Sequence, residues 1–486
     1  MNQRHSISIA MLLALTLGVA RAQDNPPAQA PDSGQPSAQE PVPAFGQENP
    51  PQPVSENPPI SGLDLPALGP HAAPLSYLQP GLHLTQSVDS NVADTVGGSN
   101  TRSITRALGS LDLQRLWSRY KLALDYAGGA GYYNAPHIGL KQVQQLELDQ
   151  RISWKRGQLG LRDSFSYLPE GNFGGAYGSL NSEEQILAGG GIGGQGGFPG
   201  GAQFGALGQT PRIVNLALVD LTENLTPKSS LTANGGYAIE HFTHRISTTA
   251  GLPFNSFLGS SEISAQAGYD RNLGPHDQAA LVYGYQGFDF SFSGLAFHSH
   301  VIQAMWGHRL SGRMDFVVGA GPQFTMLATS GSPSNLRITT AGRASLRYKF
   351  PDKMLLNLSF FRYNTSGSGI FAGAVSNVAR LSVHRPITRV WSAFVDAGYA
   401  HNTRLQVLPT IPGSTFSLAK TYDYGFAGLG AERRIGRSFR FFASYQFNDL
   451  AFDSSFCTPQ TVCSRISQRH VGSLGLDWTP RPIRID

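Results

Sequence analysis

The fold is decided by residues 143–167, which read VQQLELDQRISWKRGQLGLRDSFSY. Four large apolar residues of its first half share one parity, and they are Leu146, Leu148, Ile152 and Trp154. All of its charged residues have the other parity, which holds Gln145, Glu147, Asp149, Arg151 and Ser153. Because successive side chains of a β-strand point to opposite faces, this run predicts a strand with one apolar and one charged face. Lys155, Arg156 and Gly157 join it to a second alternating run, so the stretch predicts a β-hairpin.

The same unit, two alternating runs with a short joint, occurs eight times. The joints are Ser118-Arg119, Lys155-Arg156-Gly157, Thr226-Pro227-Lys228, residues 272–277, Ser311-Gly312, Pro351-Asp352-Lys353, Pro386-Ile387-Thr388 and Ile435-Gly436. The connections between these hairpins are mostly longer and rich in Gly, Ser and Asn. Alternation of short turns with long loops is typical of an outer-membrane β-barrel, where the turns lie on one side of the membrane and the loops on the other.

The alternating runs predict an all-β fold, a transmembrane antiparallel up-and-down β-barrel of about 18 strands. The expected strands are 76–87, 103–116, 120–133, 142–154, 158–167, 212–225, 229–242, 259–271, 277–290, 297–309, 313–327, 335–349, 354–366, 373–385, 389–402, 420–434, 437–448 and 467–479. The even number puts both ends of the barrel on the short-turn side. One merged or missed hairpin would give 16 or 20 strands. Residues 213–225 alternate poorly, and Asp163 falls on the apolar face of its run.

Alternation alone would also fit a soluble β-sandwich, so the tryptophans help to decide. Four of the five lie within a few residues of a short joint and the fifth ends the last strand: Trp117, Trp154, Trp306, Trp391 and Trp478. Amphipathic rings prefer the membrane interface, and barrels carry aromatic girdles there. A soluble core would not explain why the indoles gather at one end.

Composition excludes two classes of protein. After residue 22, no apolar run of the 486-residue chain approaches the roughly 18 residues of a membrane-spanning helix, so a helical membrane protein is excluded. The formal net charge is only +5 and no basic cluster is interleaved with aromatic residues, so nucleic-acid binding has no support.

Four segments are expected along the chain. Residues 1–22 read as a signal peptide, with a basic start, an apolar stretch and the small-residue site Ala20-Arg21-Ala22. Residues 23–74 are dominated by Pro, Gln, Ala, Ser and Glu, and predict a disordered periplasmic tail that acts as a spacer or docks to a periplasmic partner. Residues 75–479 form the barrel, and residues 480–486 a C-terminal tail.

From Leu75 to Trp478 the chain resembles the porin-like outer-membrane β-barrel proteins of Gram-negative bacteria, and no signature identifies a subfamily. The resemblance implies a location in the outer membrane, contact with its lipids and insertion by the barrel assembly machinery. One departure concerns that machinery, which often reads a C-terminal aromatic residue, because here eight residues follow Trp478.

The charged face of the strands predicts a set of residues that line the lumen. They are Arg106, Arg151, Arg162, Arg337, Arg343, Arg347, Arg380 and Arg440, with Asp112, Asp125, Glu147, Asp149, Glu240, Asp315, Asp396 and Asp477. Such charges set the ion preference of a channel, or pair across neighbouring strands and stiffen the wall. The excess of arginine on the 337–380 side favours a mild anion preference.

The connection 169–211 is the third long loop and is rich in glycine. In porins the third loop commonly folds into the lumen, so this loop is either a constriction or a surface loop. Its candidate constriction residues are Glu170, Phe173, Glu183, Glu184 and Phe198. Cys457 and Cys463, the only cysteines, are expected to form a disulfide in a late loop, because export exposes them to an oxidising compartment.

No catalytic or cofactor-binding motif is present in the sequence, and no cofactor is expected. His298 and His300 share a face but lack a carboxylate partner in sequence, so a structural or solvated role is favoured over metal binding.

Barrels of 16 to 18 strands leave room for an aqueous lumen. We therefore expect a non-enzymatic channel for passive diffusion of small hydrophilic solutes. The alternatives are a component of polysaccharide export or surface assembly, and a structural or adhesive barrel with a closed lumen. The sequence leaves the oligomeric state open.

Overall fold

The structure is a computed structural model. It describes residues 59–61, 76–91, 101–134, 139–168, 212–242, 259–290, 295–329, 332–351, 353–367, 371–406, 419–456 and 464–485. The chain divides into two units, Met1–Ala44 and Phe45–Asp486, and every described residue belongs to the second. The signal peptide, the third long loop and both cysteines lie outside the described residues.

The described residues form long strands with short joints on one side. Their bounds are β1 Tyr77–Asp89, β2 Arg102–Leu116, β3 Tyr120–Tyr133, β4 Gly139–Trp154, β5 Gly157–Leu168, β6 Arg212–Thr226, β7 Ser229–Phe242, β8 Ser260–Asn272 and β9 Asp277–Phe290. They continue with β10 Leu295–Ser311, β11 Met314–Thr329, β12 Ser332–Lys349, β13 Leu355–Thr365, β14 Ala374–Pro386, β15 Trp391–Arg404, β16 Thr421–Ile435, β17 Phe439–Phe452, β18 Ile466–Trp478 and the two-residue β19 Ile483–Arg484. One 3-10 turn, Ser454–Phe456, follows β17. Within the described ranges no helix is long and apolar enough to cross a membrane.

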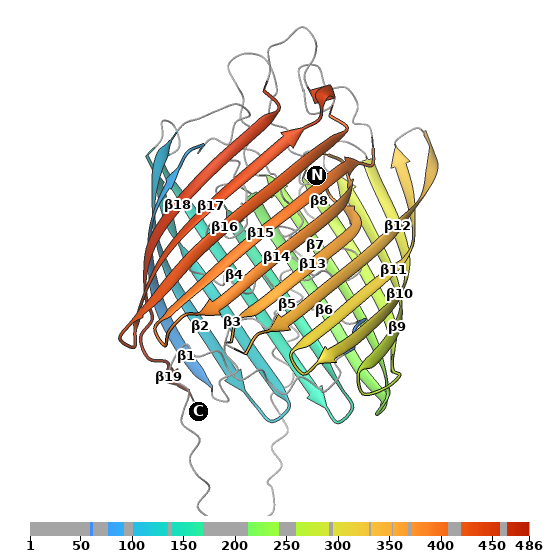
Figure 1. Cartoon of the computed structure of the whole chain (residues 1–486), viewed down its shortest axis with the longest axis horizontal. Coiled ribbons are helices and arrows are strands. Elements are labelled where there is room, and N and C mark those ends of the chain that lie inside the picture. The colour runs from blue at the N-terminus through green and yellow to red at the C-terminus, as the bar shows by residue number, and fades with distance from the viewer. Residues whose placement is uncertain are drawn as a thin grey trace, which may run out of the picture. The chain divides into compact units, whose positions relative to one another are not determined.

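Each strand from β1 to β18 pairs antiparallel with the next, and β18 pairs with β1, so the sheet closes on itself (Figure 1). In the closing pair Leu84 lies opposite Leu476. The expected barrel of 18 strands is confirmed. Expected and observed strand ends differ by at most four residues, as at the end of β17, which lies at Phe452 instead of residue 448. β19 adds a short pairing of Ile483 and Arg484 with the start of β1.

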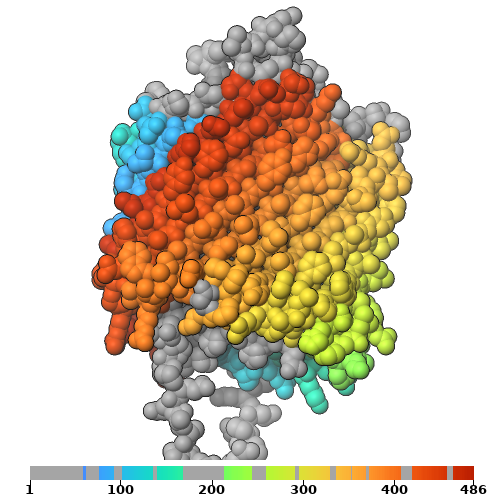
Figure 2. Space-filling view, viewed as in Figure 1, coloured from blue at the N-terminus to red at the C-terminus, as the bar shows by residue number. Residues whose placement is uncertain are grey.

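The outer face of the barrel is apolar. Its outward side chains include Leu281, Leu429 and Leu474, which are more than half exposed because no protein covers them. Figure 2 shows the outer surface of β11 to β18 as one continuous wall. The five tryptophans are all on this face, with exposed fractions of 37% to 45%. They lie at the short-turn end, where the Trp154 indole donates to Glu223 at 2.7 Å and the Trp306 indole to Asp277 at 3.2 Å.

Tyrosine and histidine pairs mark the outward face toward the long-connection end. The Tyr283 hydroxyl lies 2.8 Å from Nδ1 of His300, and the Tyr285 hydroxyl 2.9 Å from Nδ1 of His298. A third pair joins Tyr445 to His470 at 2.7 Å. His298 and His300 thus have tyrosine partners on the lipid-facing side, and the described residues contain no group of three or more His, Cys, Asp or Glu suited to a metal ion.

Two irregularities of the sequence have a structural explanation in β5 and β6. Asp163 does point outward, and there its carboxylate accepts a hydrogen bond from Asn215 at 2.7 Å. β6 alternates poorly because its inner face is apolar as well, since Leu216 and Leu218 are buried with Ala238 of β7.

We expect a charge on the outer face to cost stability according to its depth. Ile302 lies near the middle of β10 and Leu310 at its short-turn end, and both side chains are exposed on the outer face. Ile302→Arg should lower the free energy of unfolding from lipid vesicles by about 2–4 kcal/mol, and the control Leu310→Arg by about 0–1 kcal/mol. Equal losses in urea titrations followed by tryptophan fluorescence would contradict the assignment of this face to lipid.

Candidate functional site

The inner wall carries ion pairs that cross from strand to strand. On β4 to β6, Arg162 lies between two carboxylates, with its Nη2 3.5 Å from Asp220 and its Nε 4.0 Å from Asp149. Asp149 also lies 3.6 Å from the guanidinium of Arg151. The aspartate is almost fully buried, and the flanking arginines balance its charge.

A second network of ion pairs links β16, β17, β18 and β1 across the closure of the barrel. Arg440 reaches Asp477 at 2.9 Å and Glu432 at 3.2 Å, and Asp477 also contacts Nδ1 of His83 at 2.9 Å. Nearer the long-connection end of the same two strands, Arg469 of β18 pairs with Asp89 of β1. The two strands that close the barrel are therefore joined by charged side chains as well as by backbone hydrogen bonds.

Two of the four arginines expected to favour anions, Arg347 and Arg380, form ion pairs with aspartates. Arg380 binds Asp396 through two hydrogen bonds of 3.0 and 2.7 Å, and Arg347 lies 3.1 Å from Asp315. The strand register places Arg106, Arg337, Arg343 and Glu147 on the same inner face as these pairs. The ion pairs of Arg347 and Arg380 favour the stiffening role, and a role of these residues in ion preference stays a prediction.

The expected constriction residues Glu170, Phe173, Glu183, Glu184 and Phe198 lie outside the described residues, as do Cys457 and Cys463. A different segment occupies the interior at the long-connection end. It is residues 371–374, the end of the connection between β13 and β14 together with the first residue of β14. Phe371, Ala372 and Ala374 are at most 1% exposed.

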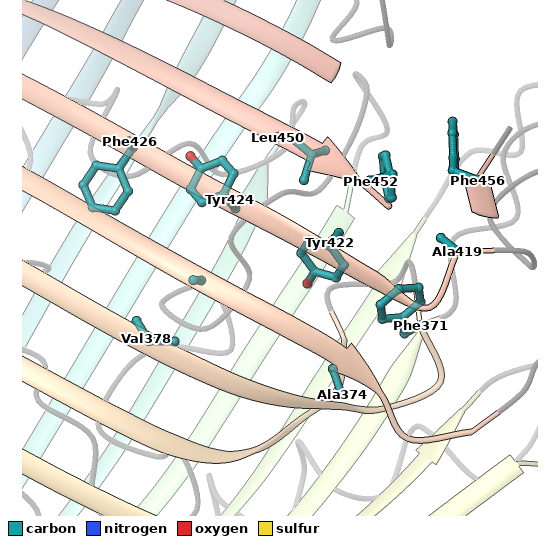
Figure 3. Packing of buried hydrophobic residues seen from close by; sticks show 11 residues of the cluster. Phe371, Ala374, Val378, Ala419, Tyr422, Tyr424, Phe426, Leu450, Phe452 and Phe456 are labelled. Carbon is teal, nitrogen blue, oxygen red and sulfur yellow. The ribbon is translucent and has the colours of Figure 1, made fainter. Parts of the chain in front are cut away.

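One side of residues 371–374 packs on the inner face of β14 to β17. Tyr422, Tyr424 and Phe426 are consecutive inward residues of β16, and Leu450 and Phe452 are inward residues of β17. Figure 3 shows their side chains gathered with Phe371 and Phe456. The Phe371 ring centroid lies 5.1 Å from that of Tyr422, and Phe452 stacks on Phe456 at 4.3 Å.

The other side of the same segment packs on the inner face of β9 and β10. Ala372, Val375 and Leu405 form one cluster with Phe288, Phe290, Leu295 and Phe297. β11 to β15 separate β10 from β16 along the sheet. Residues 371–374 therefore connect two distant parts of the wall through the interior. We call these residues and the two clusters the apolar layer.

The path of β13 explains how the chain reaches the interior. β12 and β13 pair only from Gly342–Arg362 to Lys349–Leu355. The part of β12 before Gly342 and the part of β13 after Arg362 are therefore separated from each other. Beyond this point the Asn364 side chain donates to Ser299 and Thr325, both at 2.8 Å, on the inner face of β10 and β11. Gly373 then turns with φ of +88°, and a Cβ on it would lie 2.6 Å from the Phe297 ring. Only glycine meets both conditions without strain.

Sequence reasoning missed this layer because it expected polar residues on every inward face. The signal was present, since Tyr422, Tyr424 and Phe426 share a parity with Glu432, which pairs with Arg440 on the inner face. Gly367 and Gly373, both with positive φ, bracket the connection that enters the interior.

Asp453 fastens the edge of the apolar layer just beyond the end of β17. Its carboxylate accepts backbone hydrogen bonds from Lys420 at 2.8 Å, Thr421 at 2.7 Å and Ser455 at 2.9 Å. These donors flank Ala419 and Phe456, which belong to the layer. Partial burial raises the pKa of the Asp453 carboxyl, but the Ser455 hydroxyl and the three N–H groups outweigh it, so the pKa is lowered overall.

The architecture is that of a porin-like outer-membrane β-barrel. No family model matches the chain, and no curated protein matches it. Among solved structures, OccAB2 of Acinetobacter baumannii is 10% identical and covers 84% of this chain and 98% of its own, with a TM-score of 0.41. OccK2 (OpdF) of Pseudomonas aeruginosa is 9% identical with the same coverage and a TM-score of 0.40. A bacterial polysaccharide outer membrane secretin is 9% identical over 83% of this chain and 98% of its own, with a TM-score of 0.31.

We call the hydrogen bonds that the Asp453 carboxylate accepts from residues 420, 421 and 455 the Asp453 clasp. The pH dependence of stability in Asp453→Asn tests this clasp. Because the folded-state pKa is lowered, the ionised carboxylate stabilises the fold above its unfolded-state pKa, and this contribution disappears as the pH falls through the folded-state pKa. Unfolding titrations should therefore show wild type more stable than Asp453→Asn at pH 7, with a difference that shrinks on acidification. Asp423→Asn is the control, since Asp423 bonds only side chains on the outer face. A difference for Asp453→Asn that is independent of pH would contradict the clasp.

Proposed function

We propose that this protein is a channel of the bacterial outer membrane for passive diffusion of small hydrophilic solutes. The short turns would face the periplasm and the longer connections the exterior. The observation that carries the proposal is the contrast between the two faces of the closed sheet, apolar outside and lined with charges and amides inside. A polar inner wall is what an aqueous pathway needs, and a sealed structural barrel does not require one.

The apolar layer narrows this pathway near its outer end. Aromatic and aliphatic side chains from β9, β10, β14, β16 and β17 meet residues 371–374 there. Hydrophobic constrictions gate channels by losing water. We propose that the layer limits passage and that solutes cross where the polar wall continues beside it.

The basic test is conductance of purified protein in planar lipid bilayers. We expect stable single-channel steps that persist across applied voltages. No conductance from protein that is heat-modifiable on a gel, and hence folded, would refute the channel and favour the closed structural barrel. Loss of surface polymer on gene deletion, with solute uptake retained, would instead favour polysaccharide export.

The proposed ion preference is mild and favours anions. Arg347 and Arg380 form ion pairs with Asp315 and Asp396, which limits the excess positive charge of that side. In a KCl gradient we expect a reversal potential slightly toward the chloride potential. Asp396→Asn removes the partner of Arg380 and should move it further in that direction, while Arg380→Gln should move it back. A shift in the same direction for both variants would contradict a role of this pair in selectivity.

Phe371→Ala tests the constriction directly. Phe371 is 1% exposed and contacts the wall through Tyr422, so its removal opens space inside the layer. Single-channel conductance should rise. Phe360→Ala is the matched control, because Phe360 is 43% exposed on the outer face and its removal should leave conductance unchanged. Unchanged conductance in Phe371→Ala would show that the layer lies off the solute path.

A further inference from the structure

A short piece of the Pro-rich segment lies inside the barrel. Of residues 23–74, which the sequence predicts to be a disordered periplasmic tail, the structure describes Pro59, Ile60 and Ser61. Ser61 is fully buried, and its partners are inward side chains of β7 and β8. They lie toward the short-turn end, since Asp270 is two residues before the end of β8 at Asn272.

Every polar group of Ser61 is bound by the wall. Its N–H donates to Oδ1 of Asp270 at 3.0 Å, and its hydroxyl donates to Oδ2 of the same carboxylate. The hydroxyl oxygen also lies 2.6 Å from that of Thr232, and the carbonyl oxygen accepts from Nε2 of Gln266 at 2.6 Å. Fixing each of these three side chains costs rotamer entropy. A tail that only lay near the wall would therefore not make four such contacts.

The wall side chains are themselves buried and complementary to a peptide. Asp270 is 1% exposed, Thr232 3% and Gln266 5%. A buried carboxylate needs donors, and Ser61 supplies two of them from adjacent atoms. Gln266 in turn donates to the peptide carbonyl. The set therefore recognises backbone N–H and C=O groups together with a hydroxyl, which is the chemistry of a serine within a chain.

The surrounding wall is shaped for this segment. Gly268 lies between Gln266 and Asp270, and a Cβ on it would come within 2.4 Å of the Ser61 Cβ and 2.8 Å of the Thr232 hydroxyl. The Ile60 side chain packs against a buried apolar cluster that includes Val282, Val301 and Met305. A methyl of Ile60 would lie 3.1 Å from a Cβ on Gly307 of β10. Glycines thus stand where the segment approaches both β8 and β10.

We propose that Thr232, Gln266, Gly268 and Asp270 form a binding site for the chain's own Ile60-Ser61 segment, which tethers the N-terminal region to the inner wall and narrows the interior at the short-turn end. The site would hold Ile60 and Ser61 inside the short-turn end of the barrel. Narrowing of the pathway rests on the proposed channel function, whereas the tether itself does not.

The tether is tested by disulfide trapping in the full chain, in a background of Cys457→Ser and Cys463→Ser. Ser61→Cys combined with Thr232→Cys should crosslink on mild oxidation, because their hydroxyl oxygens are 2.6 Å apart. The control pairs Ser61→Cys with Ser473→Cys, since Ser473 is an inward, buried residue of β18 that contacts Ser87 of β1. Mobility on denaturing gels with and without reductant gives the yield. A yield no higher than in the control overturns the proposal.

A methyl group added to the wall at Gly268, where Ser61 packs, tests whether the segment can be released. Gly268→Ala should reduce the trapping of the Ser61→Cys and Thr232→Cys pair about 10-fold, a factor that corresponds to about 1.4 kcal/mol. Gly428→Ala is the matched control, because Gly428 faces inward on β16 and its Cβ would meet only ordinary contacts, the nearest at 3.6 Å. Equal trapping in the two variants would overturn the fit of the segment to Gly268.

Conductance tests whether the tether narrows the pathway. Ser61→Ala leaves every barrel residue in place and removes the hydroxyl that Asp270 and Thr232 bind, so conductance should rise in it and in Gly268→Ala, but not in Gly428→Ala. Unchanged conductance together with efficient trapping would overturn the narrowing and leave the tether. A protein that traps the segment but never conducts would refute the proposed channel and not the tether.

Discussion

Closure of the backbone hydrogen bonds is the constraint on which the rest of this structure depends. Hydrocarbon offers no partner for N–H and C=O groups, so a sheet that crosses a bilayer must pair its first strand with its last. Here β1 pairs with β18, and Asp89 and Arg469 add an ion pair across the same joint. Once the sheet is closed, the two-residue period of a strand decides for each residue whether it faces lipid or the interior. The same rule collects most charges on the inner face and leaves few, such as Asp163 and Asp423, on the outer one.

Departures from that rule mark the sites where the interior is modified. The inward aromatic residues of β9, β10, β16 and β17 are expensive to leave in water and have no lipid to face. They are buried because residues 371–374 enter the interior and cover them. At the short-turn end, a distant part of the chain again covers a buried group. The carboxylate of Asp270 accepts hydrogen bonds from Ser61, which lies before the first strand. The described interior is therefore modified at both ends by parts of the chain that are not barrel wall.

The apolar layer and the Ser61 contact are held by different interactions, so we expect them to differ in how easily they open. The apolar layer is held by packing and by the Asp453 clasp, and is covalently continuous with β13 and β14. The Ser61 contact is held by a few hydrogen bonds and one apolar side chain. Its partners lie on β7 and β8, far in sequence from residue 61. Packing of many side chains resists release, whereas a few hydrogen bonds of modest net strength can exchange with water. Of the two, the Ser61 contact is the one suited to reversible opening.

The sequence by itself determined the strands, a number close to 18 and the face to which most side chains point, because these depend on local parity, short joints and tryptophan positions. The ion pairs could be anticipated only as inward charges, since pairing such as Arg380 with Asp396 depends on the register between strands. The apolar layer and the Ser61 site were decided by tertiary structure alone. Both join residues far apart along the chain, Phe371 with Phe452 and Ser61 with Asp270, and no periodic pattern records which distant surface will cover a buried group. Local repetition therefore specifies the wall, while the contents of the barrel depend on long-range contacts.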